Sequence, residues 1–403
     1  MNILKKVYCR AFQGGFRIAI PLLPYREPVI MNSIDEVPKL LQAKKIKRLL
    51  LVTDQGIRKI GLTKPFEEGC KKSGIEVFIY DQTIVNPTVA NVEEARKMYL
   101  KYRCEALLAV GGGSAMDCAK ATGARIVKPK KSLSSMKGIL KVHKRLPLLI
   151  AVPTTAGTGS ETTVAAVITD EKNSRKYPIN DFPLIPHYAV LAPELTVGLP
   201  KNLTATTGLD ALTHAVEAYI GRSTTKKTRK QAVKAIGLIF ENLEIAYNQP
   251  ENIKARGAML EAAYLAGCAF TVSYVGYVHA IAHSLGGCYH TPHGLANSVL
   301  LPYVLEGYGS HIHKKLWKLA IHTGLATSNV TYEEGAKLFI QKIWELNRQM
   351  EIPTTIPEIK EEDIKMLARY ADQEANPLYP VPVLLNAKEL EKYYRIAKNG
   401  KFN

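Results

Sequence analysis

The pattern of apolar residues changes near residue 195, and this change limits the possible folds more than any other feature of the sequence. Before it, short apolar runs that suit buried strands alternate with stretches of helical spacing, such as 91–102. Strands that alternate with helices of this length indicate βαβ units and a mainly parallel sheet. The expected strands are 48–54, 76–81, 106–110, 147–153 and 188–193.

Beyond residue 195, apolar residues recur at the spacing of helices, and hardly any strand-like segment remains. The expected helices are 204–221, 228–248, 253–270, 278–287, 294–309 and 332–350. With 403 residues, the chain exceeds the roughly 250–300 residues that one hydrophobic core usually supports. We therefore expect an α/β nucleotide-binding domain with a parallel, Rossmann-like sheet over residues 1–195, and an all-α domain over residues 196–403.

The composition fits a protein of the reducing cytoplasm. The six cysteines show no Cys-x-x-Cys spacing, which argues for free thiols. No uncharged apolar run reaches the roughly 18 residues that a membrane span needs, so we expect no membrane partner. In the first 24 residues Arg10 and Arg17 interrupt the apolar run, which is not the pattern of a signal peptide. The first thirty residues could add an edge strand or an oligomer contact.

The net charge of +18 raises the question of an anionic partner. We expect no nucleic acid, because no nucleic-acid motif is present and the basic residues are not interleaved with aromatic ones. Nine basic residues and no acidic one lie between Cys118 and Ser160: Lys120, Arg125, Lys128, Lys130, Lys131, Lys137, Lys141, Lys144 and Arg145. This stretch is either a solvated basic loop or a field that steers an anionic cofactor into a nearby cleft.

Glycine-rich segments follow two of the expected strands. The segment 107–123 reads LLAVGGGSAMDCAKATG, and its glycines let the backbone approach a ligand closely. The helix that follows offers unpaired N–H groups to a pyrophosphate, although a tight turn without a ligand is the alternative. The segment 153–163 reads PTTAGTGSETT and adds hydroxyl groups. Two such loops at the carboxyl ends of neighbouring strands form a crevice of the kind in which α/β sheets bind ligands.

Asp54 stands at the end of the expected strand 48–54. A carboxylate in that place can accept both hydroxyl groups of an adenosine ribose and would repel a 2′-phosphate, which favours NAD over NADP. The alternative is a helix N-cap, a role for which aspartate is equally suited.

Histidines are crowded in the helical half of the chain, where four of the ten lie between residues 279 and 293. Asp210 and His214 are four positions apart, so on a helix they share one face. His279 and His283 have the same spacing, and His293 follows. A carboxylate with two or three imidazoles suits one divalent first-row metal, Fe²⁺ or Zn²⁺ foremost. His290 competes with His283 for a role, and spacing alone cannot rank them.

Together, the motifs GGGSAMDCAK, PTTAGTGSE, GLDALTHAVEAY and HAIAHSLGGCYHTPHG make the chain resemble the iron-containing (group III) metal-dependent alcohol dehydrogenases. The resemblance runs from about residue 52 to 302, with all four motifs in order. It implies the dehydroquinate synthase-like fold of that family, in which metal and nicotinamide meet in the cleft between the two domains. Ala165 departs from the diol-specific branch of the family, which carries an asparagine there.

The resemblance also implies a role for individual residues. The metal ligands would be Asp210, His214, His279 and His293, with His283 as a histidine near the nicotinamide. The cofactor contacts would be Asp54, Asn86, Gly112, Gly113, Ser114, Asp117, Thr154, Thr155, Thr158, Val167 and Lys176.

We therefore expect a homo-oligomeric, NAD(P)-dependent alcohol dehydrogenase or aldehyde reductase that transfers hydride between a small primary alcohol and nicotinamide. NAD is favoured over NADP, and Fe²⁺ over Zn²⁺ or another divalent ion. The metal would act as a Lewis acid on the substrate oxygen, while His283 either relays a proton or only positions a partner. One alternative is a glycerol or polyol dehydrogenase on the same scaffold. Another is a basic, non-catalytic protein that binds nucleotides or nucleic acid.

Overall fold

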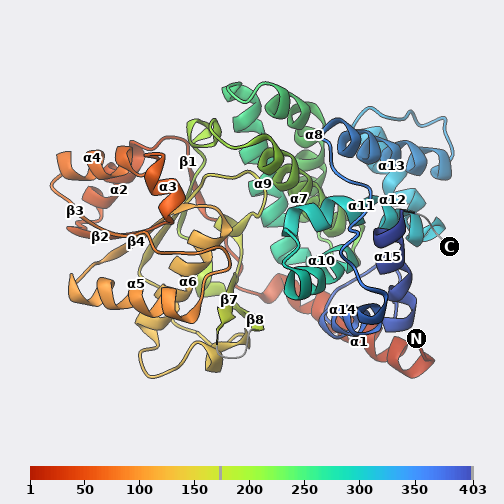
Figure 1. Ribbon diagram of the computed structural model, residues 1–403, viewed down its shortest axis with the longest axis horizontal. Helices are drawn as coiled ribbons and strands as arrows, with labels where there is room; N and C mark the ends of the chain where they lie inside the picture. Colours follow the sequence, from red (N-terminus) through yellow and green to blue (C-terminus); the bar gives the residue numbers. More distant parts are fainter. Residues whose placement is uncertain (172–174, 401–403) are drawn as a thin grey trace. The chain divides into compact units, whose positions relative to one another are not determined.

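The chain forms two compact units, one of Pro24–Leu199 and the other of Met1–Leu23 together with Pro200–Asn403. The computed structural model describes residues 1–171 and 175–400. The first unit is built on a parallel sheet and the second is helical, which confirms the fold class that the sequence predicts (Figure 1).

The α/β unit contains a six-stranded sheet in the order β1-β9-β6-β4-β2-β3, and every pair in it is parallel. Its strands are β1 (Val29–Met31), β2 (Arg48–Val52), β3 (Glu76–Tyr80), β4 (Ala106–Gly111), β6 (Leu148–Pro153) and β9 (Tyr188–Val190). All five expected strands are present, each within a few residues of its predicted bounds.

Helices cover both faces of this sheet: α2 (Glu36–Ala43), α3 (Gln55–Lys59), α4 (Lys64–Lys72), α5 (Val89–Lys101) and α6 (Gly113–Val127). Alternate residues of β4 belong to two different cores. Leu107 packs in one core with Ala119 of α6, whereas Leu108 packs in the other with Phe66 of α4. A strand buried on both faces has to be apolar throughout, which explains why the central strands read as continuous apolar runs.

A smaller sheet, which the sequence does not predict, lies beside the main one. It has the order β5-β8-β7 and contains β5 (Gly138–Ile139), β7 (Ala165–Asp170) and β8 (Arg175–Asn180). β7 and β8 form an antiparallel pair. Ala166 and Ile168 of β7 are buried in the core that contains α6, while Val167 between them is exposed.

The helical unit contains α1 (Ile3–Ala19), α7 (Lys201–Ile220), α8 (Lys226–Asn248), α9 (Ile253–Ser273), α10 (Tyr277–Tyr289), α11 (His293–Tyr308), α12 (Ser310–His322), α13 (Tyr332–Gln349), α14 (Ile364–Ala375) and α15 (Ala387–Asn399). No strand occurs among the described residues of this unit, in agreement with the expected all-α domain. The sequence predicts six of these helices and leaves α1, α12, α14 and α15 unassigned.

The N-terminal residues are a correction to the expected domain boundaries. The sequence places residues 1–195 together, but Met1–Leu23 belongs to the helical unit. The reason is hydrogen bonding to residues near the other end of the chain: Arg10 Nη1 donates to the carbonyl oxygen of Val381 (2.8 Å), and Gln13 Nε2 donates to that of Tyr379 (2.7 Å). The expected edge strand exists further on, as β1, which pairs only with β9 in the sheet.

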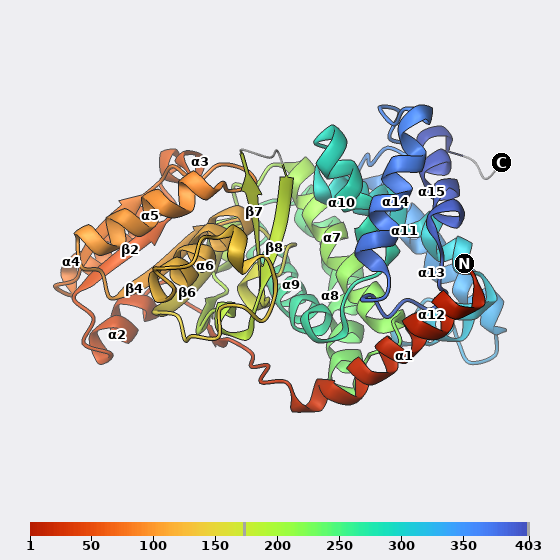
Figure 2. The ribbon, with the colours of Figure 1, turned by 90° about the horizontal axis from the view of Figure 1, so that it is seen from below.

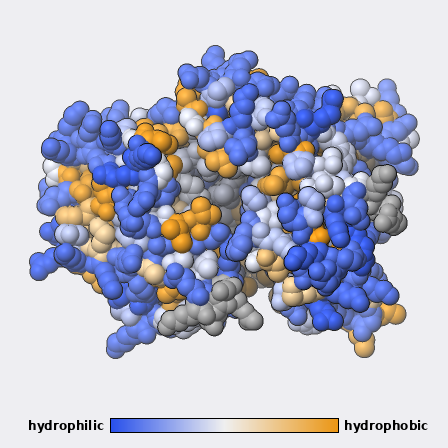
Figure 3. All heavy atoms as spheres, viewed as in Figure 1, coloured by the Kyte–Doolittle hydropathy of each residue, from blue (hydrophilic) through white to orange (hydrophobic). Residues whose placement is uncertain are grey.

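Among the described residues, no single helix has both the length and the apolar character needed to cross a membrane; α9 and α10, bent by 100°, meet the criteria only as a pair. The side of the molecule seen in Figure 3 is mainly hydrophilic, with hydrophobic residues in small groups.

Candidate metal centre and cofactor cradle

Helix α7 provides the first part of the candidate metal centre. Asp210 and His214 lie one turn apart on the same face, as their spacing predicts. Glu217, three positions further, lies on that face too, and all three side chains are buried. The sequence motif contains this glutamate, but the sequence predicts no role for it. Its spacing of three residues from His214 is the signal that could have placed it on the same face.

Helices α10 and α11 provide two further imidazoles. His279 lies in the first turn of α10, and His293 is the first residue of α11. Between them α10 ends at Tyr289, and the next residue, His290, has a left-handed backbone conformation (φ 56°, ψ 23°). The chain then turns sharply and starts α11 after Pro292, which brings the ring centroids of His279 and His293 to 5.4 Å.

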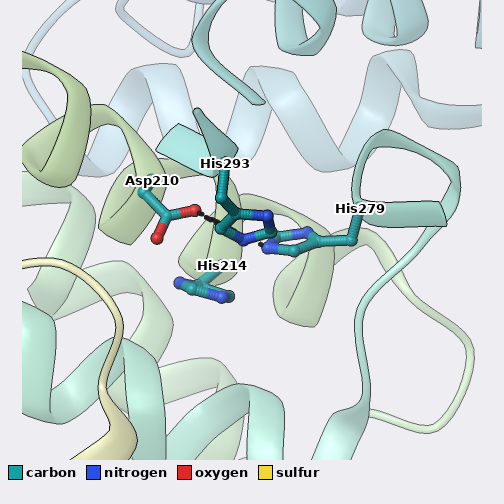
Figure 4. Close-up of side chains that lie close together, drawn as sticks. All are labelled: Asp210, His214, His279 and His293. Carbon is teal, nitrogen blue, oxygen red and sulfur yellow. Dashed lines mark ion pairs between the residues drawn. The ribbon is translucent and has the colours of Figure 1, made fainter. Parts of the chain in front are cut away.

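The four side chains converge as Figure 4 shows, with one ligand atom from each lying within 4.8 Å of all the others. Asp210 Oδ1 is 3.4 Å from His293 Nε2 and 3.8 Å from His279 Nε2. His214 stacks between Phe270 and His279, with centroid distances of 4.1 Å and 4.4 Å. One carboxylate and three imidazoles around one point are a donor set for a divalent first-row metal.

Glu217 determines which nitrogen of His279 faces this point. Its Oε2 accepts the N–H of Gly276 (2.8 Å) and its Oε1 that of Val278 (2.9 Å). A carboxylate that accepts on both oxygens makes His279 Nδ1, 2.6 Å from Oε2, the donor. The Nε2 of His279 then carries the lone pair, and it is buried with no hydrogen-bond partner among the described residues.

Burial favours the neutral, metal-binding form of these imidazoles. It holds the pKa of His279 well below its ordinary value and, despite the nearby Asp210, lowers the pKa of His293 to about 4. Burial also raises the pKa of Glu217 to about 7. Asn297, on α11 one turn after His293, donates from Nδ2 to Asp210 Oδ1 (2.7 Å) and so orients the carboxylate.

The orphaned Nε2 of His279 and the neutral imidazoles fit a bound metal ion. A buried polar atom without a partner costs about 1–3 kcal/mol, and a metal ion at the point of convergence would remove that cost. The arrangement is therefore a candidate site for one divalent metal ion.

His283 lies beside the four converging side chains, and its own side chain is 44% exposed; His290 is exposed at the end of α10. The His283 ring stacks on His293 at 5.1 Å, and its Nδ1 is 2.5 Å from Oε1 of Glu374 on α14. Burial opposes a charge on His283, but the Glu374 carboxylate outweighs it and raises the pKa of His283. Tyr379 also donates to Oε1 of Glu374, at 2.7 Å.

Aromatic side chains surround this part of the helical unit. Phe270 stacks on His214, and the rings of Tyr274 and Tyr379 are 6.3 Å apart. Tyr277 is different, because its hydroxyl group is buried in hydrogen bonds with Asn376 (3.1 Å) and the backbone at Leu385. It is a core residue.

In the α/β unit, the two glycine-rich segments meet at the ends of neighbouring strands. β4 ends at Gly111 and β6 at Pro153, and these two residues are paired in the sheet. A Cβ atom on Gly112 would lie 3.7 Å from Thr155 Oγ1, and one on Gly113 would lie 3.2 Å from Thr158 Cγ2. The segment 153–163 therefore lies directly against the glycine turn, as the crevice prediction requires.

Thr155 gives this turn a hydroxyl group that suits a phosphate. Its Oγ1 is buried and has no hydrogen-bond partner among the described residues, and it faces the N-terminus of α6. A dinucleotide phosphate would satisfy both the hydroxyl group and the unpaired N–H groups of the helix. Thr154, by contrast, is engaged through its N–H, which donates to the carbonyl oxygen of Gly111 (3.1 Å).

Most of the other predicted cofactor residues surround the same turn. The N–H of Asn86 donates to Ser114 Oγ (3.2 Å), and Asn86 has a left-handed backbone (φ 59°). Asp117 Oδ2 accepts the N–H of Val167 (3.0 Å). Lys176 lies on β8, paired with Thr169, whose Oγ1 donates to the carbonyl oxygen of Asn86 (3.2 Å).

Asp54 is the N-cap of α3, because its Oδ1 accepts the N–H of Ile57 (2.9 Å). Its second oxygen, Oδ2, lies on the glycine-turn side, 3.6 Å from where a Cβ atom of Gly111 would be. The capping role and a contact with a ribose are therefore compatible, since each uses a different oxygen.

The basic stretch 118–160 is only partly a solvated loop. Lys120 is fully buried, and its Nζ donates to Ser160 Oγ (3.0 Å), Thr163 Oγ1 (2.8 Å) and the carbonyl oxygen of Ala165 (2.9 Å). Burial lowers its pKa to about 8. Arg125 is buried as well and is paired with Glu93. These two residues cannot contribute to an exposed steering field, because they join α6 to neighbouring segments.

Two family models match the chain. The first, described as iron-containing alcohol dehydrogenase, covers residues 29–193. The second, described as the C-terminal part of the Fe-containing alcohol dehydrogenase family, covers residues 204–397.

Several known proteins are similar over most of their length. Alcohol dehydrogenase 4 of Saccharomyces cerevisiae is 40% identical over 85% of this chain and 89% of its own. The 1,3-propanediol dehydrogenase of Citrobacter freundii is 37% identical over 95% of this chain and 98% of its own. The NAD-dependent methanol dehydrogenase of Bacillus methanolicus is 35% identical over 87% of this chain and 92% of its own.

Two solved structures share the fold. A 1,3-propanediol oxidoreductase has a TM-score of 0.88 and 35% identity, covering 93% of this chain and 99% of its own. The sulfoacetaldehyde reductase of Bifidobacterium kashiwanohense, solved in complex with NAD⁺, has a TM-score of 0.83 and 28% identity, covering 94% of this chain and 99% of its own.

Proposed function

Because the chain belongs to the iron-containing alcohol dehydrogenase family, we propose that it transfers hydride reversibly between a small primary alcohol and NAD at one divalent metal ion. The observation that supports this most is the convergence of Asp210, His214, His279 and His293, whose ligand atoms lie within 4.8 Å of one another. Membership in an oxidoreductase family removes the support for a non-catalytic nucleotide- or nucleic-acid-binding protein.

In this proposal Asp210 and the three histidines hold the ion, with Fe²⁺ favoured by the family and Zn²⁺ allowed by the same donors. When bound, the metal supplies Lewis acidity at the substrate oxygen and the nicotinamide supplies or accepts the hydride. Glu217 keeps His279 in the tautomer that presents Nε2, and Asn297 holds the Asp210 carboxylate in place.

His283 is the group that we propose to handle the proton. Its Nδ1 is engaged with Glu374, so exchange with a substrate or with solvent takes place at Nε2. Tyr379 completes this chain by donating to the same carboxylate oxygen. General acid–base catalysis by a positioned histidine typically contributes a factor of about 10²–10⁴ to the rate.

The cofactor is proposed to lie over the glycine turn of the α/β unit. Gly112 and Gly113 let its phosphates approach α6, and Thr155 and Thr158 provide hydroxyl groups beside them. Asp54 carries a negative charge next to this turn, which favours NAD over NADP. The NAD-dependent methanol dehydrogenase and the NAD⁺ complex among the similar proteins support this choice.

The substrate is proposed to be a short primary alcohol or its aldehyde. The similar proteins differ in this respect, with methanol and 1,3-propanediol in their names. Phe270, Tyr274 and Tyr379 make the surroundings of the metal centre fairly apolar, which favours a simple alcohol. A glycerol or polyol dehydrogenase remains the second candidate because of the propanediol enzymes.

The test combines metal analysis with turnover. Protein purified without oxygen is expected to contain one divalent ion per chain and to form NADH with primary alcohols from ethanol to hexanol. 1,3-Propanediol and glycerol in the same assay distinguish the second candidate. His293→Ala should lose both metal and turnover, whereas His283→Ala should keep the metal and lose about 10²-fold or more in kcat. Full activity of His293→Ala without bound metal would contradict the proposal.

A further inference from the structure

Helix α1 carries most of its large apolar side chains on its solvent side. Leu4, Val7 and Ile18 are 81%, 62% and 77% exposed. At the helical spacing of 3.6 residues they share one side with other apolar residues. We call this side the apolar face of α1; it contains Ile3, Leu4, Val7, Tyr8, Ala11 and Ile18. A helix on the surface of a globular protein normally has the opposite arrangement, with apolar residues toward the core.

The opposite side of α1, which includes the buried Cys9 and Gln13, attaches it to the helical unit. Gln13 is buried and hydrogen-bonds to the backbone of Tyr379, while Arg10 donates to the carbonyl oxygens of Val381 (2.8 Å) and Pro382 (2.9 Å). Lys5 forms an ion pair with Asp372 (3.0 Å). Figure 2 shows the helix running along the outside of this unit. These bonds fix the orientation of α1, so that its apolar face points toward the solvent.

The charged side chains that α1 itself carries are all basic, and the nearby Asp372 carboxylate is already paired with Lys5. The first acidic residue of the chain is Glu27, and Lys6, Arg10 and Arg17 lie along one edge of the face at helical spacing. A second copy of α1 packed against the face would bring the same positive charges and no carboxylate to balance them. An apolar surface covered with anionic groups complements both the face and its edge.

We propose that the apolar face of α1 binds an anionic lipid surface. The helix would lie in the plane of the membrane interface, with Val7 and Ile18 among the acyl chains and Lys6 and Arg17 at the headgroups. The family models begin at residue 29, so this segment lies outside the part of the chain that they match. The proposal revises the expectation of no membrane partner. Arg10 and Arg17 interrupt the apolar run along the chain. On the helix, however, both lie on one edge and leave the apolar face continuous.

The test is co-sedimentation of the full chain with lipid vesicles. Vesicles of phosphatidylcholine with phosphatidylglycerol are compared with vesicles of phosphatidylcholine alone. We expect binding to the anionic vesicles, weakened by salt because screening shortens electrostatic attraction to about 10 Å at 0.1 M. Val7→Gln with Ile18→Gln should weaken vesicle binding at least about tenfold, and Lys6→Gln with Arg17→Gln should remove its salt dependence.

The matched control is Ile245→Gln with Leu338→Gln, which changes two exposed apolar residues on α8 and α13 of the same unit. It should bind vesicles like the unchanged protein, and all variants should keep their alcohol oxidation in solution. Absence of vesicle binding, or equal binding by the α1 variant and the control, would overturn the proposal. If the α1 variant instead changes the oligomeric state in solution without any vesicle binding, the face is a contact between copies.

Discussion

At the level of single residues, the candidate metal centre depends on side chains outside the proposed ligand set. Glu217 is the clearest case, because it accepts two backbone N–H groups and one imidazole N–H. Gly276 is part of this arrangement, since a Cβ atom there would lie 2.6 Å from Glu217 Oε1. The orientation of His279 therefore comes from a buried carboxylate and from the space left beside it.

The variant Glu217→Gln measures this contribution. An amide has one accepting oxygen where the carboxylate has two, so one N–H partner loses its acceptor and His279 loses its fixed tautomer. We expect the metal affinity to fall about 10- to 100-fold, as measured by competition with a chelator. Glu241→Gln, an exposed change on α8, is the control and should leave the affinity unchanged. Equal affinity in the two variants would show that Glu217 does not orient the ligand.

Asp54 is the residue on which the cofactor preference depends. Asp54→Gly should raise kcat/KM with NADP relative to NAD by about tenfold, because a 2′-phosphate no longer meets a carboxylate. Loss of the N-cap to glycine costs only a few tenths of a kcal/mol, so the fold should survive. Asn252→Gly removes the N-cap of α9 and serves as the control. An unchanged cofactor ratio would remove Asp54 from the ribose site.

At the level of elements, the metal centre requires close approach of α7 and α11. A Cβ atom on Gly294 would lie 2.5 Å from the carbonyl oxygen of Thr206, so the first turn of α11 packs against the backbone of α7. This contact brings His293, at the start of α11, to the face of α7 that carries Asp210 and His214.

Gly294→Ala should separate these two helices. We expect a loss of about 1–3 kcal/mol in the free energy of unfolding, together with weaker metal binding. Gly237→Ala is the matched control, since no atom lies within 4 Å of its added Cβ and helix propensity favours alanine. Urea unfolding and metal titration of both variants provide the measurement. Wild-type metal affinity in Gly294→Ala would mean that the close approach does not position His293.

His187 connects two strands of the main sheet and predicts how stability depends on pH. His187 directly precedes β9, and its Nδ1 accepts the N–H of Leu149 in β6 (3.1 Å). Burial, with the help of Arg26 and Arg145, lowers the pKa of His187 to about 4. Between pH 6.5 and 4 the unfolded chain therefore binds a proton that the folded chain does not, so stability falls as the pH falls through this window.

We expect wild type to lose about 1–3 kcal/mol more than His187→Gln between pH 6.5 and 4, because glutamine does not titrate. Urea unfolding followed across this range gives the difference. His322→Gln, at an exposed position of α12, should behave like the wild type. A parallel loss in His187→Gln would assign the acid sensitivity to other groups.

For the whole molecule, a metal bound only by the folded chain adds to its stability. The four proposed ligands lie on α7, α10 and α11, so the ion would join three helices that are distant in sequence. At a metal concentration of about one hundred times the dissociation constant, the gain is about 2.7 kcal/mol.

Removal of the metal with a chelator should therefore lower the Tm, and added Fe²⁺ should restore it. Asp210→Asn, which lacks the ligand carboxylate, should show a low Tm in both conditions. Calorimetry of the two proteins with and without chelator is the measurement. A Tm that is the same for wild-type protein with and without the chelator would show that no ion contributes to the folded state.

Local patterns in the sequence determined the elements and part of the site. Period and length separate the buried strands from the helices, so five strands of the main sheet and six helices of the helical unit follow from spacing alone. The spacing of Asp210 and His214 places them on one face for the same reason. The resemblance to a known family identifies the distant imidazoles that join them. Spacing along the chain does not identify those imidazoles.

Only the tertiary structure decided the features that depend on contacts between distant segments. Glu217 faces His279, Asn297 faces Asp210, and Lys120 is buried among hydroxyl and carbonyl groups, none of which a one-dimensional pattern displays. The N-terminal helix shows the same limit, because its place beside α14 depends on hydrogen bonds to residues more than 360 positions away. A pattern records the neighbours of a residue along the chain, whereas burial, hydrogen bonding and charge pairing depend on its neighbours in space.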